Sequence, residues 1–168
     1  MRISGSSEDS IVAGFITAAR IYCENAQHRA YVSQTWDLYL DDWPRRPIIV
    51  PLPPLQSVTS ITAYLTGGTA ATVATTVYQV DSAGEPGRID LAYGQSWPGD
   101  ALRSMNGFAV RFVAGGTVAD VAETHKLAIK ELAAHWYENR EATIDETIQR
   151  PIPLGLESLL WQDKQVKL

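Results

Sequence analysis

The spacing of apolar residues changes twice along this chain, and these changes limit the folds that it can adopt. Between residues 7 and 29 apolar side chains recur at helical intervals, which predicts an amphipathic helix. Between about residues 34 and 114 they alternate with polar residues in short runs, which predicts strands. From about residue 119 to 142 the helical spacing returns. The pattern predicts an α+β fold with a core of long amphipathic helices that bracket a strand-rich antiparallel insertion.

Prolines restrict how the strands of this insertion can pair. Five of them lie between Pro44 and Pro54. Because proline fixes φ and lacks an N–H donor, this run must be an extended connection or a sheet edge. Residues 57–65 and 72–80 flank Gly67-Gly68 and predict a hairpin. Residues 88–93 and 108–113 predict two further strands, each bounded by glycine-containing turns.

The length of 168 residues predicts one domain rather than two. Its helical parts are expected at about 6–30 and 119–142, the β insertion at about 34–114, and a C-terminal docking tail at 143–168. The end of this tail is apolar enough to need a surface to lie on. It predicts a short helix that contains Leu156, Leu159, Leu160 and Trp161.

Composition argues against several classes of protein. Cys23 is the one cysteine, so neither an intrachain disulfide nor a cysteine-based zinc site can form. Fourteen basic residues against nineteen acidic ones give a formal charge of -5, which opposes general binding to nucleic-acid phosphates. No apolar stretch approaches the roughly 18 residues that cross a bilayer, and the first residues form no apolar signal core. We therefore expect no membrane association.

The chain offers few residues in patterns that carry catalysis. Glu131, His135 and Glu138 are spaced to share one helical face and are the best candidates for metal ligands. An ordinary solvated helix face explains this spacing better. Cys23 lies in an apolar helical stripe and is expected to be a small buried hydrophobe. The sequence has neither a nucleophile elbow nor a phosphate-binding loop, and no cofactor is predicted.

Five tryptophans are spread over every predicted element. Core packing is the expected role of Trp36 and Trp136. Because tryptophan is enriched at interface hot spots, others are candidates for contacts with partners. The predicted partner-interface residues are Trp43, Trp97, Leu156, Leu159, Leu160 and Trp161.

Several sequence runs together resemble the head-tail connector (adaptor) proteins of long-tailed phages and prophages. The more specific runs are Thr35-Trp36-Asp37-Leu38-Tyr39-Leu40-Asp41-Asp42-Trp43-Pro44 and Trp136-Tyr137-Glu138-Asn139-Arg140-Glu141. The likeness continues to the tail that ends in Ser158-Leu159-Leu160. Relatives usually carry a further helix ahead of the segment equivalent to Arg2-Ile3-Ser4, where the printed sequence begins. The resemblance covers nearly the whole chain.

This resemblance implies a structural protein of the virion neck and not an enzyme, made in the bacterial cytoplasm during assembly. Family members form a ring of about twelve subunits that docks beneath the portal protein and meets a downstream neck or tail-completion protein. The genome passes through the lumen of such a ring, and sequence-specific binding of DNA is not expected. Two other functions stay open at this point: a small metal-dependent enzyme that uses Glu131, His135 and Glu138, and an acidic nucleic-acid-associated regulator.

Overall fold

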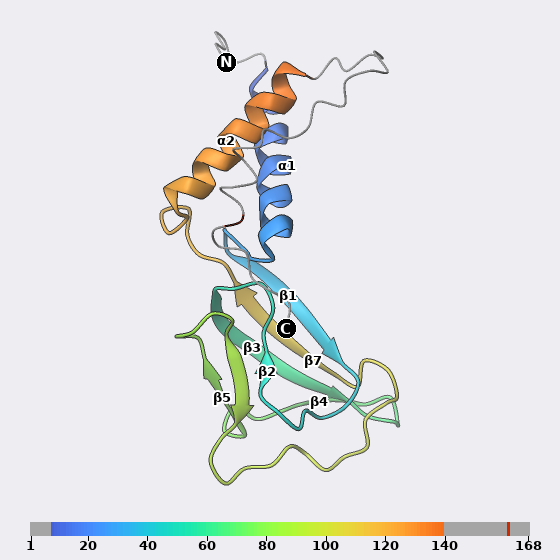
Figure 1. The fold of residues 1–168 in the computed structure, drawn as a ribbon. Helices are drawn as coiled ribbons and strands as arrows, with labels where there is room; N and C mark the ends of the chain where they lie inside the picture. The colour runs from blue at the N-terminus through green and yellow to red at the C-terminus, as the bar shows by residue number, and fades with distance from the viewer. Residues whose placement is uncertain (1–7, 140–160, 162–168) are drawn as a thin grey trace. The chain divides into compact units, whose positions relative to one another are not determined.

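A computed structural model of the chain describes residues 8–139 and Trp161, which belong to two compact units (Figure 1). Residues 8–31, 119–139 and Trp161 belong to the helical unit, and residues 32–118 form the β unit. No helix among the described residues is long and apolar enough to span a bilayer.

Two helices make up the described core of the helical unit. Helix α1 spans Asp9–Gln27 and helix α2 spans Glu123–Glu138. Asp9 and Glu123 lie in the first turns, where the positive end of the helix dipole favours a carboxylate. Helix α1 ends because His28 adopts a left-handed conformation (φ 56°), after which the N–H of Arg29 donates to the carbonyl oxygen of Glu24 at 3.1 Å.

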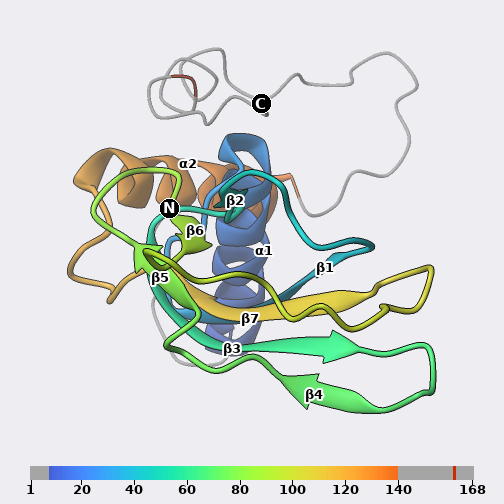
Figure 2. The same ribbon diagram turned by 90° about the horizontal axis from the view of Figure 1, so that it is seen from below.

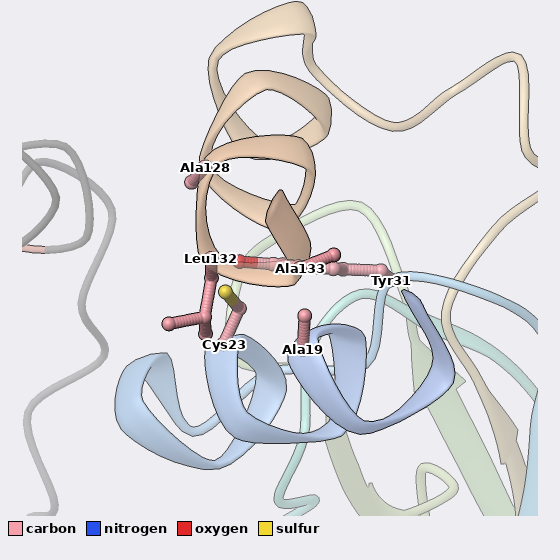
Figure 3. Packing of buried hydrophobic residues seen from close by; sticks show 6 residues of the cluster. All are labelled: Ala19, Cys23, Tyr31, Ala128, Leu132 and Ala133. Carbon is pink, nitrogen blue, oxygen red and sulfur yellow. The ribbon is translucent and has the colours of Figure 1, made fainter. Parts of the chain in front are cut away.

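The two helices pack through small side chains. Leu132 of α2 lies beside Cys23 of α1, and Ala19 points toward α2 (Figure 3). Small residues let the helix axes approach closely, which leaves Leu132 as the largest fully buried hydrophobic side chain of this cluster. Aromatic pairs extend the contact at its margins, with Phe15 edge-on to Tyr137 and Tyr22 edge-on to Trp136.

A buried polar network joins the end of α1 to α2. The Tyr31 hydroxyl donates to Oε1 of Gln27, and Nε2 of Gln27 lies 3.3 Å from Nε2 of His125. The Tyr31 ring stacks on the His125 ring with 4.7 Å between centroids. Glu24 accepts from the Tyr31 N–H at 2.8 Å and pairs with Arg20 at 2.7 Å. These bonds satisfy polar groups that would otherwise be costly to bury.

The larger sheet of the β unit has four strands in the order β1-β7-β3-β4. They span Gln34–Leu40 (β1), Phe108–Ala114 (β7), Leu55–Tyr64 (β3) and Ala70–Thr72 (β4). Every neighbouring pair is antiparallel, and β1 and β4 form the two outer edges (Figure 2). Phe108, Val110 and Phe112 share one face of β7 and supply much of the core.

The smaller sheet has three strands in the order β2-β6-β5, which span Ile48–Ile49, Arg88–Leu91 and Tyr78–Asp81. Ile48 and Ile89 face each other in register, and both are buried. As the prolines require, β2 is a two-residue edge strand between Pro47 and Pro51.

The predicted core of long helices around a β insertion is wrong. Among the described residues the chain has two helices and seven strands in two antiparallel sheets. The helices lie where the periodicity placed them, but the bulkiest buried side chains, Phe108, Phe112, Ile61 and Ile89, lie in the strands. The strand-rich part, residues 32–118, therefore has a core of its own and is not an appendage of a helical core. The predicted tail helix lies outside the described residues, except for Trp161.

Candidate interaction surfaces

Trp43 and Trp97, two of the predicted interface residues, meet in an aromatic stack. The Trp43 ring lies between Trp97, at 5.5 Å between centroids, and the buried Phe108, at 5.3 Å. Its indole Nε1 donates to the carbonyl oxygen of Asp100 at 3.4 Å. Both tryptophans are half-buried. The stack ties two long loops to β7, and a further role of Trp43 and Trp97 in partner contacts stays a prediction.

The solvent-facing side of the larger sheet carries a second set of aromatic and charged residues. Arg111 of β7 donates through Nε and Nη2 to the two carboxylate oxygens of Asp37 on β1, each at 2.8 Å. Tyr39 and Tyr64 border the same shallow hollow, whose volume is about 120 Å³. The Arg103 guanidinium carbon lies 4.2 Å from the centroid of the Tyr64 ring. Tyrosine and arginine are enriched at interface hot spots, so this face fits protein contact.

The ion pair in this hollow perturbs both of its members. Hydrogen bonding to Arg111 holds the pKa of the Asp37 carboxyl below its ordinary value, and the same contact raises the pKa of the Arg111 guanidinium. Both groups are therefore charged at neutral pH. Because Arg111 uses a bidentate fork, it also fixes the relative orientation of the two side chains.

The smaller sheet has a hollow of about 350 Å³ whose lining includes Gln79, Val80, Asp81, Arg88 and Asp90. Arg88 pairs with Asp81, whose pKa is lowered by this contact and by hydrogen bonds from backbone N–H groups. The pair is half-exposed on both sides. Asp90, the other carboxylate of the hollow, accepts from the backbone N–H of Leu91 at 2.8 Å.

The described residues contain no cluster of three or more histidine, cysteine, aspartate or glutamate side chains arranged to hold a metal ion. Glu131, His135 and Glu138 share helix α2 but form no such group, so the alternative of a metal-dependent enzyme lacks support. Cys23 is fully buried, as the sequence predicted, and burial raises the pKa of its thiol to about 11. The thiol is therefore protonated at neutral pH and is a poor nucleophile.

Of the four remaining interface candidates, the structure describes only one. Leu156, Leu159 and Leu160 lie outside the described residues, whereas Trp161 is described and is 70% exposed. Trp36, predicted to pack in the core, is 45% exposed. The alternation in residues 35–41 already placed Asp37 and Tyr39 on one strand face. Sequence reasoning missed Arg111, Tyr64 and Arg103 as their neighbours because the pattern of one strand does not reveal which distant strand pairs with it.

No protein-family model and no curated protein sequence matches this chain. Solved structures do share its fold. A chain in the virion of a native gene transfer agent (GTA) particle superposes with a TM-score of 0.77 at 20% identity, over 98% of this chain and 81% of that one.

Chains from the necks of GTA particles are similar to the same degree. One, from the neck of the native particle computed with C12 symmetry, gives a TM-score of 0.74 at 21% identity, over 94% of this chain and 84% of that one. Another, from the neck of the empty particle computed with C6 symmetry, gives 0.76 at 21% identity, over 100% of this chain and 85% of that one. At this level of identity the likeness establishes a common fold.

Proposed function

We propose that this protein is a structural component of the neck of a phage-like particle and assembles there as a homo-oligomeric ring. The observation that carries the proposal is the shared fold: chains of a GTA virion and of GTA necks match over nearly the whole chain with TM-scores of 0.74 to 0.77. The sequence resemblance to head-tail connectors supports the same role independently.

The finer part of the proposal concerns the neighbours of the ring. We assign one axial face to the portal protein and the other to a downstream neck or tail-completion protein. The apolar tail residues Leu156, Leu159, Leu160 and Trp161 are assigned to docking on the portal, because an apolar segment needs a surface to cover it. A net charge of -5 suits a channel through which DNA passes, since each basic contact with phosphate would hold the duplex back.

Assembly of the purified protein tests this proposal. We expect sedimentation velocity and negative-stain electron microscopy to reveal closed rings of about twelve subunits, alone at high concentration or after addition of a phage portal protein. A protein that stays monomeric under both conditions would contradict the proposal. Stoichiometric bound metal in the purified protein would instead favour an enzyme.

A further inference from the structure

We propose that the free edges of β1 and β4 pair with each other between neighbouring copies, so that the four-stranded sheet continues from one subunit to the next. This inference rests on the proposed function, because it concerns the lateral contact of a ring. Each edge is proposed to pair with a second copy of this chain.

Hydrogen-bond alternation shows which groups β1 presents at its free edge. The Tyr64 N–H donates to the carbonyl oxygen of Gly107 at 2.8 Å, and the Gly115 N–H donates to that of Pro54 at 2.9 Å. The odd-numbered residues of β7 therefore bond to β3, which leaves its even-numbered residues to bond to β1. Because those residues pair in register with Trp36 and Leu38, the backbone groups of Thr35, Asp37 and Tyr39 point away from the sheet.

The same reasoning identifies the donors on β4. The Val73 N–H bonds to the carbonyl oxygen of Ile61 at 2.8 Å, so Ala71 and Val73 face β3. The backbone groups of Ala70 and Thr72 consequently point outward. The larger sheet thus has two open edges among the described residues, one at each end of its strand order.

Neither edge carries a proline, a lysine or an unpaired charge, which are features by which natural sheets block strand pairing. Another such feature, a very short edge strand, is present at β4, which has three residues. Strand β1 contains no proline and no lysine, and its one charge, on Asp37, is neutralised by Arg111. Residues 66–80 around β4 contain neither a charged residue nor a proline. The smaller sheet differs, because Pro47 and Pro51 flank its edge strand β2.

The strand directions suit a contact that repeats head to tail. Because all three pairings in the sheet are antiparallel, β1 and β4 run in opposite directions. A copy rotated about an axis parallel to the strands keeps its orientation, so its β4 would meet the first copy's β1 in the antiparallel sense. Two different surfaces that match in this way are what a ring requires, whereas pairing of β1 with β1 would close a two-fold dimer.

Exposed aromatic side chains flank the β1 edge on both faces of the sheet. Trp36 points to the side of Phe112 and is 45% exposed, whereas Tyr39 points to the opposite side and is 47% exposed. A strand added along this edge would cover both rings. When a strand is added to a sheet, backbone hydrogen bonds supply affinity. Tryptophan and tyrosine side chains that become buried at such a contact are typical hot spots.

Proline substitutions at the two edges test the pairing, with valine as the matched control. Thr35→Pro and Thr72→Pro each remove an outward N–H and no bond within the sheet. Thr35→Val and Thr72→Val change the same side chains and keep the N–H. We expect each proline variant to need a roughly tenfold or higher protein concentration for half-maximal assembly in sedimentation velocity. Both valine variants should assemble as the wild type does.

Mixing the two proline variants gives a sharper outcome. Thr35→Pro retains an intact β4 edge and Thr72→Pro retains an intact β1 edge, so the mixture should form one-to-one dimers but no rings. Normal rings from both proline variants would overturn the strand pairing and leave the proposed function standing. If Thr35→Pro lost assembly while Thr72→Pro formed normal rings, the strand pairing would also be overturned, because β1 would then contact something other than β4.

Two more results complete the test. Should circular dichroism show that a proline variant is unfolded, Thr35→Lys and Thr72→Lys place a charge at each edge and keep every backbone donor. We expect the lysine variants to fold and to lose assembly, and normal rings from them would overturn the pairing. A wild-type protein that forms no ring even with the portal would overturn the proposed function and this inference together.

Discussion

Asp37 is held in place by Arg111, which reaches it from the neighbouring strand in register. A carboxylate whose pKa is lowered in the folded state stabilises the fold above its unfolded pKa, and this contribution is lost as the pH falls through the folded pKa. The ordinary aspartate value is 3.8, and the hydrogen bonds to Arg111 move the pKa of Asp37 below it. The contribution of this pair should therefore be complete at neutral pH and disappear only in strong acid.

The substitution Asp37→Asn tests this titration. We expect it to lower the free energy of unfolding at neutral pH, and we expect the difference from the wild type to shrink as the pH falls below 3.8. Urea unfolding at a series of pH values measures both curves. Asp42→Asn is the control, since Asp42 is exposed on the same segment. A difference of equal size at neutral pH and at the most acidic pH would contradict the role assigned to Arg111.

The α1–α2 pair depends on one large apolar side chain among small ones. Leu132 is fully buried beside Ala19, Cys23 and Ala128, so shortening it leaves a void that neighbouring alanines cannot fill. We expect Leu132→Ala to lower the free energy of unfolding of the helical unit by about 2–5 kcal/mol. Leu127→Ala, on the same helix but 49% exposed, is the matched control and should change it much less. Urea denaturation followed by far-ultraviolet circular dichroism measures the difference, and equal effects would contradict the packing.

Sequence periodicity predicted individual elements better than it predicted their grouping. The first helix was expected at residues 7–29 and spans Asp9–Gln27. The expected strand at residues 72–80 instead divides into β4 and β5, which join different sheets. A turn between them, closed by the Val77 N–H bonding to the carbonyl oxygen of Ala74, separates the two pieces. Alternation continues on both sides of this turn, so the local pattern does not reveal that the chain changes sheet.

The candidate surfaces show the same division between local and long-range information. The alternation of Asp37 and Tyr39 with Trp36 predicted which residues share a strand face. Arg111 lies 74 positions further along the chain than Asp37, and only the register of β1 with β7 brings the two together. Trp43 was expected at an interface because tryptophan favours such sites, but composition does not show that Phe108 lies close enough to stack on it.

At the scale of the whole molecule, a ring subunit needs two kinds of contact. Lateral contacts join each copy to its neighbours, and axial contacts join the ring to the components above and below it. Two exposed tryptophans are assigned to different kinds: Trp36 flanks the β1 edge, whereas Trp161 belongs to the tail proposed to dock on the portal. Since these contacts use separate surfaces, a change in one should leave the other intact.

A pair of alanine substitutions tests this separation. Trp161→Ala should leave ring formation unchanged and weaken portal binding roughly tenfold or more, the loss expected for a hot-spot tryptophan. Trp36→Ala should weaken ring formation to a similar degree, because the β4 strand of the neighbouring copy would no longer cover an indole side chain. Sedimentation velocity measures ring formation, and biolayer interferometry on immobilised portal measures portal binding. If both variants lost both activities, one shared surface would explain them better; if Trp161→Ala bound portal normally, the tail would not be the docking element.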